Sequence, residues 1–225
     1  MRDLARGWHL LTVVVTAGAV LLQLVLVVTG SAVLAETDPP SLGARLGRFV
    51  CYFTIQANVL VAVSTAQLAR NATYDGGRWR VVRGAAVVGI TITGLVHFVL
   101  LRPLLELDGL DRLADPLLHL VVPALAVLGW LAFGPRPRTG RRELSLALVW
   151  PVGWLGLILV VRGASGWVPY PFLDPDGDGG WTAVAVACVG ITLLFALTCT
   201  AVYAVDRRLS PVPPVSGRGT PAARG

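Results

Sequence analysis

Six apolar runs dominate this chain of 225 residues, and each is near the length of about 20 residues that a helix needs to cross the hydrocarbon core of a membrane. They cover residues 10–35, 49–69, 84–101, 116–135, 144–161 and 181–205. Backbone groups inside a membrane must be satisfied within their own segment, so runs of this kind form helices. We therefore expect an all-α, polytopic membrane protein, with a six-helix transmembrane domain over residues 1–208 and a disordered tail over residues 209–225.

Composition excludes most soluble classes. Only 14% of the residues are charged and the mean hydropathy is +0.70, whereas a soluble domain has about 25% charged residues. All 19 basic residues are arginines that flank the apolar runs instead of forming one basic face, which argues against nucleic-acid binding. The three cysteines lie in apolar runs without CxxC spacing, so neither a disulfide framework nor a cysteine zinc site is expected.

The arginines are distributed unevenly between alternate connections. Fourteen of the 19 lie at the N-terminus, in residues 70–83, in residues 136–142 and in residues 207–224. Because positive residues concentrate on the cytoplasmic side of membrane proteins, this pattern predicts that both termini are cytoplasmic. An even number of helices agrees with that prediction. We expect a multi-pass protein of the cell membrane, and its oligomeric state stays open.

Three polar side chains are predicted to share one layer near the outer side of the membrane. At a rise of 1.5 Å per residue, Thr54, His97 and His119 lie roughly 6–9 Å below the outer ends of their helices. Asp115 and His119 share a helix face at i, i+4, so the carboxylate could orient the imidazole. Pro123 cannot bond the carbonyl of residue 119, which predicts a kink beside the histidine. Ionisable groups at membrane depth indicate a functional site.

Each of these residues also has a structural interpretation. Threonine in a membrane helix usually bonds the carbonyl four residues earlier, and an intramembrane histidine packs more often than it catalyses. Asn58 and Gln56 are typical of hydrogen bonds between helices. Asn58, His97 or backbone groups near the kink could alternatively stabilise an oxyanion.

The stretch before the last helix is the most distinctive non-helical segment. It reads G-W-V-P-Y-P-F-L-D-P-D-G-D-G-G over residues 166–180. Asp174, Asp176 and Asp178 resemble the start of a calcium-binding loop, but the twelfth position is Ala185, where a bidentate Glu is needed. We expect this segment to form an outer lid over the polar layer.

Three short stretches carry a resemblance to a known family. Tyr52-Phe53-Thr54 opens the second helix, Asp115-Pro116-Leu117-Leu118-His119 is followed by Val122-Pro123, and Gly166-Trp167-Val168-Pro169-Tyr170-Pro171-Phe172-Leu173 precedes the last helix. In order and placement they resemble the six-helix androgen-induced (FAR-type) membrane proteins and their bacterial Pr-six-Pr relatives. The resemblance spans most of residues 45–205.

That resemblance implies a threonine hydrolase acting on esters of fatty acids with hydroxy fatty acids. It would make Thr54 the nucleophile and His119 the base. Two departures stand out. Vertebrate members tend to have Asn-His-Gly-Met-His where this chain has Asp115 to His119, so an orienting Asp115 is not a shared feature. This chain also inserts Pro169 and the acidic turn.

The sequence thus predicts an integral membrane hydrolase of lipid (fatty-acyl) esters, with catalytic Thr54 and His119 supported by Asp115, His97 and Asn58. Its expected partners are membrane lipids and a lipid ester substrate, and no cofactor or metal is expected. One alternative is a non-enzymatic transporter or lipid-binding protein that uses the same polar layer. Two others are a haem protein with His97 and His119 as ligands, and a metal hydrolase using both histidines and Asp115.

Overall fold

The computed structural model describes residues 1–30, 40–136 and 138–209, and within these ranges the protein is all-helical, with no strand. The predicted tail therefore lies outside the described residues except for Leu209. In the described ranges, five helical segments are long and apolar enough to cross a membrane. They are α1 (Arg2–Thr29), α4 with η1 and η2 (Gly77–Leu104), α5 with η3 and α6 (Asp111–Phe133), α7 with α8 (Arg141–Ser165), and α9 (Gly180–Arg208).

The second apolar run, residues 49–69, folds as part of a broken helix. α2 (Leu42–Cys51) and α3 (Phe53–Arg70) meet at an angle of 63°, and together they make the sixth candidate span. Tyr52 between them is extended, with φ −65° and ψ 126°. The break leaves the Cys51 carbonyl without a helical partner, and Trp154 Nε1 donates to it at 2.7 Å. Thr54 consequently lies in the first turn of α3.

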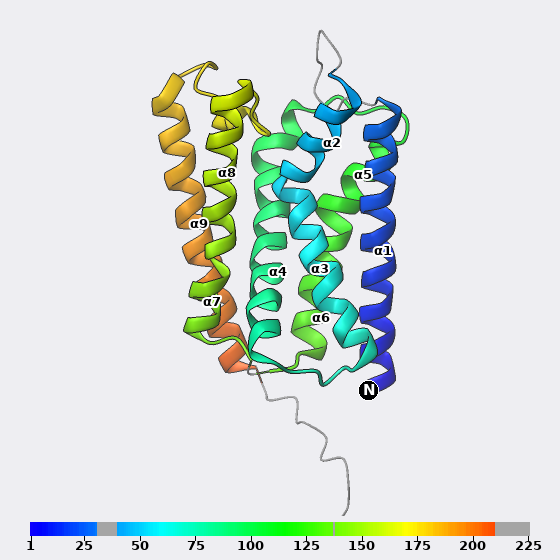
Figure 1. The fold of residues 1–225 in the computed structure, drawn as a ribbon. Coiled ribbons are helices and arrows are strands. Elements are labelled where there is room, and N and C mark those ends of the chain that lie inside the picture. The colour runs from blue at the N-terminus through cyan, green and yellow to red at the C-terminus, as the bar shows by residue number, and fades with distance from the viewer. Residues whose placement is uncertain (31–39, 137, 210–225) are drawn as a thin grey trace, which may run out of the picture.

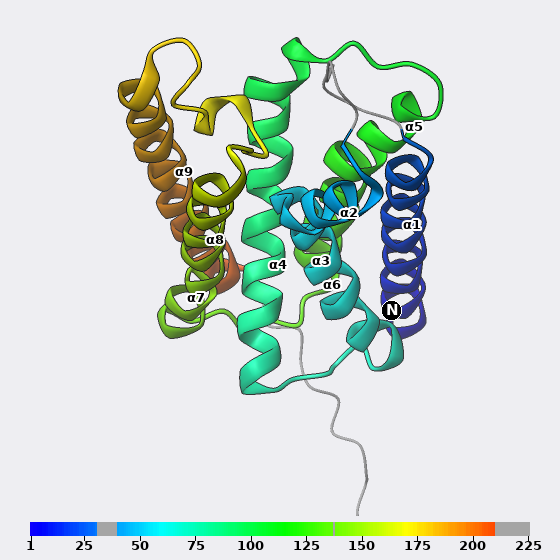
Figure 2. The same ribbon diagram turned by 45° about the horizontal axis from the view of Figure 1, so that its top comes forward.

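The helices are arranged around α3 and α4. α1 and α6 lie on one side of this pair, whereas α8 and α9 lie beside α4 on the other side (Figures 1 and 2). Small and branched residues from α3, α4 and α6, among them Ala57, Ile90, Val122 and Ala126, are almost fully buried where these helices meet. α8 is joined to α3 by the indole of Trp150, which stacks on Phe53 and donates to Gln56 Oε1 at 2.8 Å.

Two helices widen into π turns at the residues of interest. η1 (His97–Leu101) follows α4, and η3 (Leu117–Val121) lies between α5 (Asp111–Pro116) and α6 (Val122–Phe133). The interruption expected beside Pro123 is therefore a π turn, in which the Val122 N–H bonds the Leu117 carbonyl. Such turns recur at functional sites because they displace side chains from the regular helical register.

A glycine allows α4 and η3 to approach closely. A Cβ atom at Gly94 would lie 3.2 Å from the backbone oxygen of His119, the carbonyl that Pro123 cannot bond. A methyl group at position 94 would therefore require the η3 backbone to give way by a few tenths of an ångström. The close approach brings His97, the first residue of η1, beside His119.

Different segments of the chain lie at the two ends of the bundle. The N-terminus and the end of α9 lie at one end, together with residues 71–76 (Figure 1). α2, the connection after η2 and the segment containing η4 (Pro171–Leu173) lie at the opposite end. The start of α3, with Thr54, lies toward this second end.

Candidate active site

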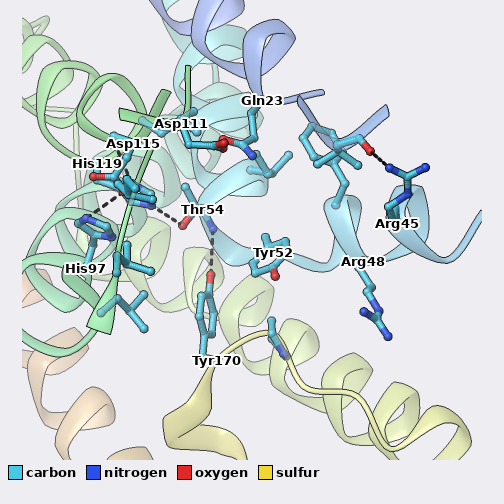
Figure 3. A pocket seen from close by; sticks show the side chains of 18 of the residues that line it. Gln23, Arg45, Arg48, Tyr52, Thr54, His97, Asp111, Asp115, His119 and Tyr170 are labelled. Carbon is cyan, nitrogen blue, oxygen red and sulfur yellow. Dashed lines mark hydrogen bonds and ion pairs between the residues drawn. The ribbon is translucent and has the colours of Figure 1, made fainter. Parts of the chain in front are cut away.

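Thr54 and His119 are within hydrogen-bonding distance of each other. Thr54 Oγ1 lies 3.3 Å from His119 Nε2, and the two side chains come from the first turn of α3 and from η3 (Figure 3). Thr54 is 8% exposed, and the His119 side chain is 15% exposed. A nucleophile and its base are expected at about 2.6–3.2 Å, often somewhat longer without substrate. The pair has the geometry of an activated hydroxyl.

Asp115 lies behind His119 and contacts three cationic or potentially cationic groups. Its Oδ1 is 3.1 Å from His119 Nδ1 and 3.2 Å from His97 Nε2, and its Oδ2 accepts from Arg102 at 3.0 Å. His119 Nδ1 is also 2.9 Å from the Asp115 carbonyl. Two acceptors at Nδ1 favour the tautomer protonated there, which leaves Nε2 free to accept from Thr54. The order Thr–His–Asp matches that of catalytic triads.

His97 is the second imidazole on this carboxylate. Its ring stacks on that of His119 with centroids 3.7 Å apart and planes 7° apart. A haem with two axial histidines must fit between their rings, and rings in van der Waals contact leave no such space. The geometry therefore contradicts the haem alternative for His97 and His119.

Asn58 joins two helices. Its Nδ2 donates to the Thr54 carbonyl at 2.8 Å and to the Leu118 carbonyl at 3.4 Å, and the residue is fully buried. The first of these bonds lies within α3, and the second ties α3 to η3, the segments that carry the nucleophile and the base candidates. Asn58 therefore positions the pair, and its amide is not directed at a substrate oxygen.

Tyr170 was not expected in the site from its residue type, although its segment was predicted to cover the polar layer. Its hydroxyl oxygen accepts the Thr54 N–H at 3.4 Å, a backbone group that no helical carbonyl can satisfy in a first turn (Figure 3). Tyr52 and Trp154 pack against the ring, and burial raises the pKa of the Tyr170 hydroxyl. The Thr54 side chain is also a hydrogen-bond partner of this hydroxyl.

These residues line a cavity of about 1360 Å³, its open mouth included. Thr54, His97, Asp115, His119 and Tyr170 form its polar wall. Its other walls are largely apolar and include Ile55, Leu101, Leu104, Leu105, Leu118 and Val168. Gln23, Arg45, Arg48 and Asp111 also line it, and the Arg48 guanidinium lies 5.3 Å from the Trp167 ring centre. An apolar chain with one polar group would be complementary to this cavity.

His97, Asp115 and His119 also meet the spacing of a metal site. Their candidate ligand atoms all lie within 4.8 Å of one another. Two imidazoles and a carboxylate make a donor set typical of catalytic zinc. Both imidazoles, however, lie at hydrogen-bond distance from the same oxygen, Asp115 Oδ1, and Arg102 occupies the other.

The acidic turn before α9 makes contacts of its own. Asp174 Oδ1 accepts the backbone N–H of Asp176, and Asp176 pairs with Arg162 at 2.9 Å. These contacts shape the turn that follows Tyr170. The segment as a whole supplies Tyr170, Trp167 and Val168 to the cavity.

Comparison with protein-family models, with curated proteins and with solved structures finds no match to this chain. The resemblance to androgen-induced membrane proteins in three short stretches stays a prediction. Inference about function therefore rests on the geometry of the Thr54 cavity.

Proposed function

We propose that this protein is an integral membrane hydrolase of lipid esters, with Thr54 as nucleophile and His119 as general base. The observation that carries the proposal is the 3.3 Å contact between Thr54 Oγ1 and His119 Nε2 in a cavity with largely apolar walls. Most threonines in these helices bond a carbonyl three or four residues earlier, as Thr65 does with Val61. Thr54, near the start of α3, is directed at an imidazole instead.

The reaction would proceed in two steps. His119 Nε2 takes the proton of Thr54 Oγ1 as this oxygen attacks the ester carbonyl carbon, and the resulting imidazolium protonates the departing alcohol. The product is an acyl-threonine. Water then attacks the acyl carbonyl while His119 takes its proton, and the fatty acid leaves as the Thr54 hydroxyl is restored.

The surrounding groups would stabilise the charges that develop. Asp115 holds the Nδ1 proton of His119 and offsets the imidazolium charge, while His97 and Arg102 keep the carboxylate in place. Tyr170 accepts the Thr54 N–H, which polarises its own O–H, and in the proposed reaction this O–H donates to the substrate oxygen that becomes negative. Tyr170 takes the oxyanion role that Asn58 is not placed to fill.

The apolar walls support a fatty-acyl ester as substrate. The leucines of η1, η2 and η3 offer hydrocarbon contacts, whereas Arg45, Arg48 and Gln23 offer a polar region for a headgroup. We infer a site at outer-leaflet depth in the cell membrane, with both termini in the cytoplasm, because 14 of the 19 arginines belong to the N-terminus, the tail and the stretches 70–83 and 136–142, which the sequence assigns to the opposite side.

Labelling with a fluorophosphonate hydrolase probe tests this proposal. Wild-type protein in detergent should label, Thr54→Ala should abolish labelling, and His119→Ala should slow it by about 100-fold or more. Thr65→Ala is the matched control, because its hydroxyl bonds only carbonyls of its own helix, those of Val61 and Ala62. Labelling of wild type no stronger than that of Thr54→Ala would refute the proposal.

The metal-hydrolase alternative is favoured by one observation, the 4.8 Å grouping of His97, Asp115 and His119. In that case the ion would activate a water, and the reaction would not need the Thr54 hydroxyl. Ester turnover by Thr54→Ala that is lost with a chelator and restored by zinc would support this alternative. Chelator-insensitive labelling at Thr54 would exclude it.

A further inference from the structure

Two arginines contact the ring of one tyrosine, Tyr203, at the end of the bundle opposite Thr54. The guanidinium of Arg141, the first residue of α7 (Arg141–Ala147), lies 5.4 Å from the centre of this ring. The guanidinium of Arg207, one turn after Tyr203 in α9, lies 5.3 Å from the same centre. Two positive charges are thus held on one ring, and an anion beside them would offset their repulsion.

No carboxylate among the described residues forms an ion pair with Arg141 or Arg207. The acid nearest to Arg141 along the chain is Glu143, two residues away, and helical residues at this spacing do not face each other. The acid next to Arg207 is Asp206, which is fully buried and whose Oδ2 accepts two backbone N–H groups of the connection before α7. An anion that compensates the two arginines must therefore come from outside this part of the chain.

The tyrosine ring orders the two guanidiniums without consuming their hydrogen-bond donors. A cation over an aromatic ring is attracted by the quadrupole of the ring, whereas the N–H groups of a guanidinium point outward in its own plane. Arg141 and Arg207 are exposed, so these donors can be reached from outside the protein. Arg142 and Arg208, the next residues along the chain, are also exposed and add two positive charges. We call these four arginines and Tyr203 the Tyr203 cluster.

The Tyr203 cluster lies at the level of lipid headgroups. α9 has 29 residues and spans about 44 Å, so each of its ends extends about 7 Å beyond a hydrocarbon core of about 30 Å. Arg207 is one residue from the end of α9. The segment from Arg141 to Ser165 has 25 residues and spans about 38 Å, which places Arg141 about 4 Å beyond the core. Both guanidiniums therefore reach the layer that holds the lipid phosphates.

Apolar side chains continue from the cluster toward the middle of the membrane. Ala196 and Val189 lie seven and fourteen residues before Tyr203, so they share its face of α9, and both are exposed. At a rise of 1.5 Å per residue they are about 10 Å and 21 Å deeper than Tyr203. A lipid whose headgroup contacts the arginines can therefore lay its acyl chains along this helix face.

We propose that the Tyr203 cluster binds the headgroup of an anionic phospholipid, with Arg141 and Arg207 donating to its phosphate oxygens. The planar fork of N–H donors on a guanidinium matches phosphate geometry. A zwitterionic phospholipid carries the same phosphate but also a cation, which four exposed arginines repel, so the cluster selects for net negative charge. This site is independent of the Thr54 cavity and does not rest on the proposed hydrolase activity.

Thermal unfolding of the purified full-length chain, followed by tryptophan fluorescence in mixed micelles, tests the proposal. Phosphatidylglycerol is titrated against phosphatidylcholine with the same acyl chains. At about 100 times its dissociation constant, phosphatidylglycerol should raise the Tm by roughly 5–10 °C, and phosphatidylcholine should not. The double variant Arg141→Gln with Arg207→Gln should need about 30-fold more phosphatidylglycerol for half of the rise, since each arginine near a lipid surface contributes about tenfold or less to binding. Tyr203→Leu keeps both charges but leaves them less ordered, and should weaken binding by about 2- to 10-fold.

The control is Arg2→Gln with Arg70→Gln, which removes the same charge from two exposed arginines at the same end of the bundle. This variant should keep nearly the full response to phosphatidylglycerol. An equal loss in both double variants would overturn the proposal, because binding would then depend on the total charge of this end and not on the Tyr203 cluster. An equal rise in Tm with the two lipids, or no rise with either, would overturn it as well. All four arginines are exposed, so the Tm of each variant in phosphatidylcholine should match that of wild type and verifies that the variant is folded.

Discussion

His97 and His119 stack face to face, with ring centres 3.7 Å apart, and both direct a ring nitrogen to the same oxygen of Asp115. Two imidazoles that share a carboxylate cannot both become protonated without repelling each other. The proton that His119 takes up during the proposed reaction would therefore be opposed if His97 were already charged. A neutral His97 that donates to Asp115 is the arrangement that suits catalysis.

His97→Phe should separate the two contacts of this residue, its stacking on His119 and its hydrogen bond to Asp115. Phenylalanine keeps the stacked aromatic ring but removes the hydrogen bond to Asp115 Oδ1. We expect fluorophosphonate labelling to slow by about 10- to 100-fold, the range seen when a supporting hydrogen bond is lost, with a Tm close to that of wild type. The pH dependence of the labelling rate should also shift. An unchanged rate and an unchanged pH profile would limit His97 to packing.

Asp115→Asn should impair the proposed reaction more strongly. The amide fills the same volume but can present an N–H to His119 Nδ1, which favours the tautomer protonated at Nε2 and removes the acceptor for the Thr54 proton. We expect a loss of about 100- to 10,000-fold in labelling rate.

Arg102→Gln is the matched comparison for Asp115→Asn. Arg102 contacts the other oxygen of Asp115, but its side chain is 54% exposed, so its removal should cost less than tenfold. Equal effects of the two variants would indicate that Asp115 acts only through the ion pair.

Tyr170→Phe tests the oxyanion role. The ring contacts with Tyr52 and Trp154 are retained, so the Tm should change little, while the hydroxyl that contacts the Thr54 N–H is lost. Removal of one oxyanion donor costs about 100- to 1,000-fold in turnover. The measurement is the rate of hydrolysis of a soluble p-nitrophenyl ester. A rise in KM with an unchanged kcat would instead assign Tyr170 to substrate binding.

Gly94→Ala should displace the base. Its Cβ would lie 3.2 Å from the His119 backbone oxygen, so η3 must move away from α4. We expect a lower Tm and a loss of labelling even though Gly94 is not an ionisable residue. The control is Gly156→Ala in α8, where an added Cβ meets no atom within 4 Å. There, the higher helix propensity of alanine should leave labelling intact and the Tm unchanged or raised.

Asp75, at the opposite end of the bundle, should make a pH-dependent contribution to the stability of the fold. The hydrogen bond from Arg80 lowers the pKa of its carboxyl below the ordinary value. A depressed folded-state pKa contributes stability above the unfolded value of about 3.9, and that stability is lost as the pH falls through the folded value. Asp75→Asn should therefore lower the Tm at pH 7, and the difference from wild type should shrink progressively below about pH 4. A difference that is constant with pH would exclude the linkage.

The helical spans were predictable because the signal is local. A run of about 20 apolar residues must bond its backbone internally in a membrane, whatever surrounds it. Hydropathy alone predicts some helices too short. The predicted run begins at residue 84, whereas α4 begins at Gly77, because Trp79 and the arginines around it continue the helix. Hydropathy therefore predicts a connection at Arg83, whereas this residue lies inside α4 and is buried.

The break at Tyr52 was not predictable from hydropathy. Nothing in the apolar run from residue 49 to residue 69 marks an end, and the break is stabilised by tryptophans about 100 residues away, Trp150 and Trp154. These indoles satisfy polar groups on either side of the break. Without it Thr54 would lie within a continuous helix, its N–H bonded to the carbonyl four residues earlier and unavailable to Tyr170.

The sequence by itself determined the helical class and the approximate spans. It also determined the i, i+4 contact of Asp115 with His119 and the common level of Thr54, His97 and His119. These features follow from helical rise and periodicity, which depend only on position along the chain. Only the tertiary structure decided that His97 shares a carboxylate with His119, that Tyr170 reaches the Thr54 N–H and that Arg83 is buried without a hydrogen-bond partner among the described residues. These contacts join segments far apart in the sequence, and their geometry depends on how closely the helices pack, as Gly94 against His119 illustrates.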